Sequence, residues 1–180
     1  MLEDLNASIQ YLQNEPADLG RLAIMGVCIS GRWPLVAASK RNDVAACVAL
    51  YGAAYPNGWQ LDEFHPETVE ALISRIQCPV LGIFGERDFI IPLDYVRRFR
   101  DALETHRKSY HIRVFYGVPH GWLNDTMPPR YRAHEAATAW ELIIDFLKQV
   151  GDGSYPADRV RWRFESEIAP DYDPANNVPM

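Results

Sequence analysis

Short apolar runs recur along the chain, and they often contain β-branched residues. The four that stand out are residues 22–27, 44–51, 80–84 and 112–116. A continuous apolar run, rather than an alternating one, is typical of a parallel strand that is buried on both faces. The pattern therefore predicts four buried parallel strands.

Segments with helical spacing precede, separate and follow these runs, at residues 2–13, 33–39, 67–76, 93–106 and 131–150. Strands that alternate with helices are joined by crossover connections, which are right-handed in nearly all proteins. We therefore expect an α/β fold with a mostly parallel sheet flanked by helices.

Two segments show neither the apolar run of a buried strand nor the spacing of a helix. Residues 53–66 contain aromatic residues, prolines and a glycine, and they are either a lid or a long loop. From Gly151 onward the chain is predicted to be extended, with Val160, Trp162 and Phe164 alternating inward. The expected organisation is an α/β domain over residues 1–150 and an extended tail over residues 151–180.

Composition narrows the class of protein. The 180 residues are 48% hydrophobic and 23% charged, as in a soluble globular domain. The net charge is −6, and no run of Lys or Arg is longer than a pair such as Arg97-Arg98, so we expect neither a nucleic acid nor a membrane as partner. A small molecule remains the expected ligand.

The cysteines and the N-terminal segment indicate the compartment. The three cysteines are widely spaced and contain no CxxC pair, which argues against a disulfide framework and against a zinc site. No basic segment leads into an apolar run of signal-peptide length, and no run is long enough to span a membrane. We expect a cytoplasmic protein with no metal ion and no cofactor.

The first strand runs into a segment with the layout of a nucleophile elbow. Residues 26–31 read Gly-Val-Cys-Ile-Ser-Gly, with small residues two positions before and after Cys28. A helix that starts at this turn would favour the reactive thiolate. Two alternatives remain open: Cys28 is a buried structural cysteine, or Ser30, which has no glycine two positions before it, is the nucleophile.

An acid and a histidine follow the third and fourth strands. Asp88 comes just after the third strand, where it could also form a turn or cap the next helix, and Glu86 is a weaker candidate for the acid. His120 comes just after the fourth strand. The other histidines lie elsewhere in the pattern and receive no function: His65, His106, His111 and His134.

Taken together, the three candidates fall at the carboxyl ends of strands in the chain order that α/β-hydrolases use. Cys28 would attack a carbonyl carbon, His120 would carry the proton, and Asp88 would hold the imidazole tautomer. The backbone N–H of Ile29 would donate a hydrogen bond to the oxyanion.

These motifs resemble the dienelactone hydrolase family of α/β-hydrolases. The resemblance runs over residues 22–150 and rests on residues 26–32, 51–52 and 79–86, on Asp88 and Pro92, and on His120-Gly121 with Tyr131 and Trp140. It implies a hydrolase of small esters or lactones. Asn124 stands where the family's type enzyme has an arginine for the substrate carboxylate, so the resemblance does not extend to that contact.

The main departure from the family lies before the elbow. Family members carry several strands and helices there, whereas this chain has only the predicted helix at residues 2–13. We therefore expect the C-terminal part of an α/β-hydrolase fold, with a second oxyanion donor missing. The strand at residues 22–27 would have an unpaired edge, covered by self-association, by a partner chain or by the tail. The alternative function is an inactive homologue that serves as an assembly module.

Overall fold

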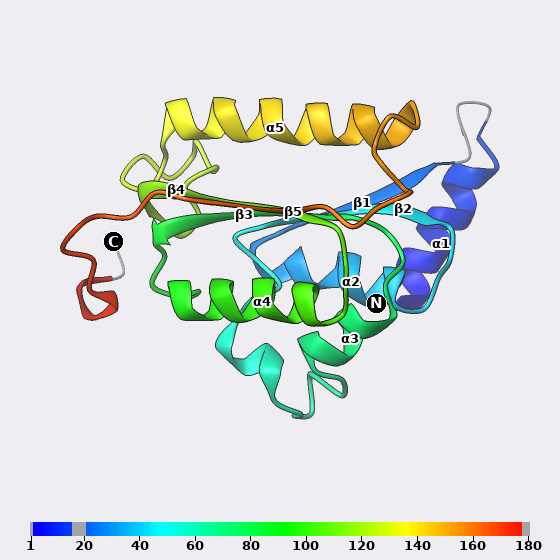
Figure 1. The fold of residues 1–180 in the computed structure, drawn as a ribbon, viewed down its shortest axis with the longest axis horizontal. Helices are drawn as coiled ribbons and strands as arrows, with labels where there is room; N and C mark the ends of the chain where they lie inside the picture. The colour runs from blue at the N-terminus through cyan, green and yellow to red at the C-terminus, as the bar shows by residue number, and fades with distance from the viewer. Residues whose placement is uncertain (1, 16–20, 178–180) are drawn as a thin grey trace.

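The computed structural model describes residues 2–15 and 21–177 (Figure 1). Its helices and strands, in chain order, are α1 (Leu2–Gln13), β1 (Leu22–Val27), α2 (Trp33–Ala38), β2 (Val44–Leu50), α3 (Val69–Arg75), β3 (Val80–Arg87), α4 (Leu93–Thr105), β4 (Tyr110–Pro119), α5 (Ala133–Gly151) and β5 (Trp162–Ser166). Short 3₁₀ helices span Cys28–Arg32, Pro56–Trp59 and Pro174–Asn176.

The strands form one parallel sheet in the order β1-β2-β3-β4-β5. Helix α5 covers one face, and α2, α3 and α4 cover the other, with α1 beside β1 and β2 (Figure 1). This layering confirms the predicted α/β class. Among the described residues, no helix combines the length and the apolar character needed to cross a bilayer.

The core has two layers, one on each face of the sheet. Cys47 and Ala49 of β2 pack toward α2, α3 and α4, whereas Val48 and Leu50 pack toward α5. Neighbouring residues of a strand point to opposite faces, so a strand covered on both faces must be apolar at every position. This is why the run at residues 44–51 does not alternate.

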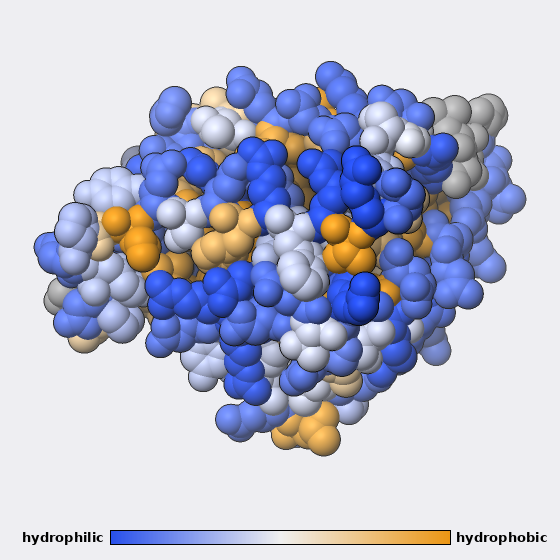
Figure 2. Space-filling view, in the orientation of Figure 1, coloured by the Kyte–Doolittle hydropathy of each residue, from blue (hydrophilic) through white to orange (hydrophobic). Residues whose placement is uncertain are grey.

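The tail contributes a fifth strand that the hydrophobic pattern did not predict. β5 pairs with β4, at the edge of the sheet farthest from β1. Val160 is 42% exposed and Trp162 is 52% exposed, so the prediction that both point inward is wrong, and only Phe164 packs partly against the core. The described part of the tail also does not cover β1, contrary to one of the possibilities raised by the sequence. Apolar surface is visible between α4 and α5 in Figure 2.

β1 lies at the opposite edge. Within the described residues it pairs with β2 alone, through a parallel ladder that runs from Leu22 to Val27. Ala23 and Met25 are exposed there, and Met25 keeps 42% of its surface accessible. The strand that leads into the elbow is therefore half-paired.

Candidate active site

The carboxyl ends of β1, β3 and β4 bring three polar side chains into one line. Cys28 follows β1, Asp88 follows β3, and His120 follows β4. The Cys28 sulfur lies 3.2 Å from His120 Nε2, and His120 Nδ1 lies 2.7 Å from Asp88 Oδ2. Parallel strands end at the same side of a sheet, and so residues far apart in sequence meet here.

The turn at Cys28 has a backbone conformation that needs small neighbours. Cys28 has φ +53°, in the left-handed region that residues with a Cβ rarely adopt. A Cβ on Gly26 would lie 2.2 Å from the Ser30 carbonyl oxygen, and one on Gly31 would lie 2.5 Å from Gly52 Cα. Only glycine fits at both positions, which explains the spacing seen in the sequence.

Ser30 braces this turn. Its hydroxyl oxygen accepts a hydrogen bond from the Val27 backbone N–H and donates one to the Val27 carbonyl, each at 2.8 Å. Both bonds tie the hydroxyl to the backbone of the elbow, while the sulfur of Cys28 faces His120. The geometry favours Cys28 over Ser30 as the nucleophile.

The Asp88 carboxylate is fully buried and has hydrogen bonds on both oxygens. Oδ2 faces His120, and Oδ1 accepts hydrogen bonds from the N–H groups of Ile90 at 2.8 Å and Ile91 at 2.9 Å. Asp88 therefore forms a turn and orients the histidine at the same time. A buried carboxylate is tolerated only with such compensation.

Glu86, the weaker candidate for the acid, is equally buried but serves another contact. Its carboxylate accepts hydrogen bonds from the Gly117 N–H at 2.6 Å and from the Ala169 N–H. The side chain of Asn177 donates to the Asp88 carbonyl oxygen at 3.4 Å. The C-terminal tail is thus fastened to the loop that carries the acid.

The electrostatics favour charge on both members of the Cys28–His120 pair. Burial acts to raise the pKa of Cys28, but hydrogen bonds from His120 and Tyr55 outweigh it and hold that pKa below the ordinary thiol value. Burial acts to lower the pKa of His120, but the hydrogen bond and charge of Asp88 outweigh it and raise that pKa. Both shifts stabilise a thiolate beside an imidazolium.

Three aromatic rings surround His120. The ring of Tyr51 meets it edge-on at 5.1 Å, and the rings of Phe89 and Tyr55 lie 6.3 Å and 6.4 Å away. The Tyr55 hydroxyl also donates to the Cys28 sulfur at 3.6 Å. No catalytic role was predicted for these residues from sequence, although Tyr51 and Phe89 follow strand ends as the triad candidates do.

The other residues considered from sequence lie outside this cluster. His65 pairs with Asp62 at 2.8 Å, and His111 pairs with Glu165 at 3.1 Å. The Asn124 side chain accepts the Thr126 N–H at 3.0 Å, so its amide oxygen closes a local turn.

Comparison with known proteins places the chain in a family. Residues 1–151 match the Dienelactone hydrolase family, and the chain belongs to it. The tail after residue 151, with β5, lies outside the matched region.

The similar proteins are longer than this chain. It is 28% identical over 156 residues to a "Putative carboxymethylenebutenolidase" of Yersinia pestis, covering 87% of this chain and 57% of that protein. It is 30% identical over 152 residues to a protein of the same name from Methylorubrum extorquens, covering 84% and 51%. The crystal structure of a "Putative Dienelactone Hydrolase" from Klebsiella pneumoniae matches with a TM-score of 0.75 at 26% identity, covering 82% of this chain and 60% of that one. The chain thus spans about half the length of these curated relatives.

Proposed function

We propose that this chain carries the catalytic triad of a hydrolase that cleaves carboxylic esters or lactones. The observation that carries the proposal is the unbroken line of contacts from buried Asp88 through His120 to Cys28. The line ends on a strained turn, and strain of this kind gathers at functional sites. Membership of the Dienelactone hydrolase family supports the same chemistry.

The first half of the proposed reaction forms a thioester. The Cys28 thiolate attacks the carbonyl carbon, and the carbonyl oxygen becomes an oxyanion. His120, held as an imidazolium by Asp88, then protonates the leaving alkoxide oxygen. In a lactone this alkoxide stays attached to the acyl group as a hydroxyl.

The second half returns the enzyme to its starting state. Neutral His120 takes a proton from water, and the hydroxide attacks the thioester carbon. The carbon–sulfur bond breaks and the acid product leaves. Since the raised pKa of His120 and the lowered pKa of Cys28 restore the ion pair, the site is ready for another substrate.

We assign the oxyanion contact to the Ile29 backbone N–H. Ile29 follows Cys28 directly, and its N–H already acts on the Cys28 sulfur, contributing to the lowered pKa. An elbow of this type supplies one donor, while a second comes from a loop elsewhere in the fold. We place that second donor outside these 180 residues, in a segment that the longer relatives carry.

The relatives suggest the substrate class. Their names describe carboxymethylenebutenolidases, and a butenolide is an unsaturated lactone. We therefore propose a small lactone or ester as substrate. The amide oxygen of Asn124 closes a local turn. We therefore do not propose that Asn124 binds a substrate carboxylate.

A second candidate function rests on the edge of the sheet. β1 pairs with β2 alone among the described strands, and unpaired strand edges are templates for association. The chain would then be an inactive assembly module that keeps the triad residues. This candidate predicts association without thioester formation.

An activated ester separates the two candidates. We expect p-nitrophenyl acetate to give a burst of nitrophenol and a transient acetyl group on Cys28, detected by intact and peptide mass spectrometry. Cys28→Ala should abolish both, whereas Cys78→Ala, which removes a cysteine outside the triad, should retain both. Acetylation that persists in Cys28→Ala, or its absence from the folded wild-type chain, would contradict the hydrolase proposal.

A further inference from the structure

A second pair of cysteines lies away from the triad, where β2 and β3 run side by side. Cys47 is in the middle of β2, and Cys78 comes two residues before β3. Their sulfur atoms are 3.6 Å apart, and both are free thiols. A disulfide needs the sulfur atoms at about 2.05 Å, so closing this pair takes a shift of roughly 1.5 Å.

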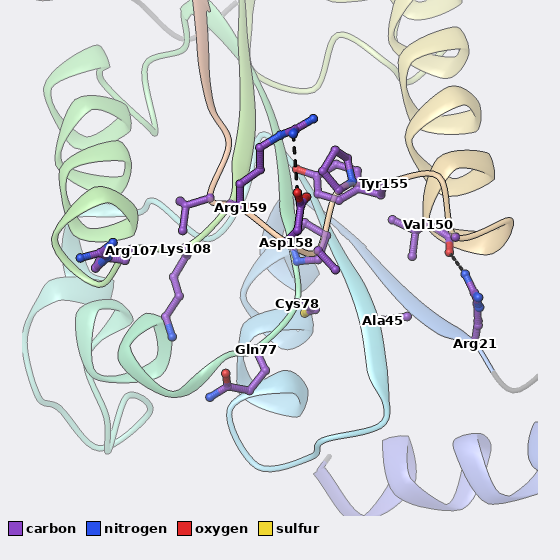
Figure 3. A pocket seen from close by; sticks show the side chains of 16 residues that line it. Arg21, Ala45, Gln77, Cys78, Arg107, Lys108, Val150, Tyr155, Asp158 and Arg159 are labelled. Carbon is purple, nitrogen blue, oxygen red and sulfur yellow. Dashed lines mark hydrogen bonds and ion pairs between the residues drawn. The ribbon is translucent and has the colours of Figure 1, made fainter.

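The two thiols differ in access. Cys78 is one of the residues that line a cavity of about 580 Å³ at the amino ends of the strands, the edge opposite to the triad (Figure 3). Cys47 does not line it and is fully buried, with its thiol donating to the Pro34 carbonyl at 3.3 Å. A reagent in the cavity therefore meets Cys78 first.

The cavity is basic on a chain whose net charge is −6. Its lining includes Arg21, Arg107, Lys108 and Arg159, against one acid, Asp158. In Figure 3 the Lys108 side chain lies to one side of Cys78, and the Asp158–Arg159 ion pair lies above it in the view. Such a lining attracts small anions.

The pair also differs in acidity. The Cys47 thiol can turn from the Pro34 carbonyl to the Cys78 sulfur, and that hydrogen bond lowers the pKa of the Cys78 thiol; the charge of Lys108 acts in the same direction against burial. The same hydrogen bond, together with burial, raises the pKa of Cys47. Cys78 is thus the better first nucleophile of the two.

We propose that Cys78 is a thiol–disulfide exchange site for small anionic disulfides, with Cys47 as the resolving thiol. The Cys78 thiolate attacks one sulfur of the disulfide R–S–S–R, forming a mixed disulfide and releasing RS⁻. Cys47 then attacks the Cys78 sulfur, forming the Cys47–Cys78 disulfide and releasing the second RS⁻. The two protein thiols are oxidised, the reagent is reduced to two thiols, and the protons of Cys47 and Cys78 end on them.

The order of the steps follows from the contacts. Once Cys78 is part of the mixed disulfide, its sulfur carries no negative charge. It therefore no longer raises the pKa of Cys47. Cys47 then exchanges its hydrogen bond to Pro34 for a bond to the sulfur already beside it. The two sulfur atoms have to approach each other by roughly 1.5 Å.

The test uses the full chain with Cys28→Ser, so that the reactive elbow thiol does not interfere. The folded protein is incubated with glutathione disulfide, quenched with acid, alkylated and mapped without reduction. We expect a cross-link between the peptides of Cys47 and Cys78, with loss of two hydrogens and little retained glutathione. If both thiols stay reduced while the denatured protein reacts, the proposal is overturned.

Single replacements in the same background fix the roles. With Cys47→Ser, we expect glutathione to remain attached to Cys78; with Cys78→Ser, we expect Cys47 to stay reduced. Faster modification of Cys47 than of Cys78 would contradict the assigned order. Circular dichroism establishes that each variant is folded.

A comparison of reagents tests the charge of the cavity. We expect the anionic glutathione disulfide to react about 3- to 10-fold faster than the cationic cystamine at low salt, with the difference shrinking at high salt. Equal rates, or faster reaction with cystamine, would contradict an anion-selective site.

Discussion

The two sides of the candidate active site differ in how completely this chain builds them. Asp88 and His120 follow β3 and β4, strands that are each paired on both sides, and both side chains are almost fully buried. Cys28 follows β1, which pairs with β2 alone within the described residues. Beside it, Ile29 is 84% exposed.

The difference indicates that the acid–base half of the site is self-sufficient, whereas the nucleophile half depends on something beyond β1. The backbone groups on the outer side of β1 need hydrogen-bond partners, from water or from another strand. The second oxyanion donor, which we propose lies outside these 180 residues, belongs to the same side of the site. Separate variants can test the acid–base half and the nucleophile half.

The largest effect is expected from removing the charge of the buried acid. Asp88→Asn should lower ester hydrolysis about 10³-fold, because the amide no longer stabilises the imidazolium and favours the wrong tautomer. The N–H bonds from Ile90 and Ile91 can be kept by the amide oxygen, so the protein should stay folded. Steady-state kinetics with an activated ester, beside Asp94→Asn as an exposed control, measures the loss. An equal loss in both variants would contradict the role of Asp88.

Adding a neighbouring strand and a second oxyanion donor to the nucleophile half of the site should raise the rate of ester hydrolysis. A fusion of this chain with the part of the Yersinia pestis relative that it does not match should supply partners for β1 and a second oxyanion donor. Such a donor typically changes the rate about 10²- to 10³-fold. The gain should appear in kcat, and Cys28→Ala in the fusion should remove it. A folded fusion with no gain would show that β1 lacks nothing the reaction needs.

A smaller effect is expected where the tail joins the sheet. Glu86→Gln replaces one accepting oxygen by an N–H₂ group that faces a backbone N–H, so it should destabilise the fold by about 1–3 kcal/mol. Urea unfolding measures the change, with the exposed Glu141→Gln as the matched control. Hydrogen exchange should quicken over residues 167–177. Equal stability in the two variants would contradict the proposed fastening.

The smallest effect is expected at the edge of β1. If the chain associates through this strand, Met25→Lys should raise its dissociation constant roughly 10-fold, because a lysine on an edge strand opposes pairing. Met127→Lys alters a methionine of similar exposure outside β1 and serves as the control. Light scattering over a concentration series measures both. A wild-type chain that stays monomeric throughout would contradict association.

The hydrophobic pattern predicted β1, β2, β3 and β4, which contain short apolar runs, and missed β5, which does not. β5 carries Arg163 and Glu165 among its five residues and none of the five is fully buried, so it has no continuous apolar run. Its place is set by a parallel ladder with β4, a contact more than fifty residues away in sequence. Pairing of that kind leaves little trace in local composition.

The candidate triad could be predicted because chemistry and position coincide in sequence. Cys28, Asp88 and His120 each come just after an apolar run, and parallel strands bring such ends together. The contact from Tyr55 to Cys28 could not be predicted, because it depends on the path of residues 53–66. The hydrogen bonds that Glu86 accepts from the Gly117 and Ala169 N–H groups also could not, because both partners lie far from Glu86 in sequence.

The most direct test of the central claim is the pH dependence of Cys28 alkylation by iodoacetamide. Because the pKa of Cys28 is lowered, its thiolate should persist as the pH falls below the ordinary thiol pKa of about 8.5, and be lost only on passing through the lowered value. The account predicts a midpoint below 8.5 that rises in His120→Ala. A midpoint at or above the ordinary value, unmoved by His120→Ala, would contradict it.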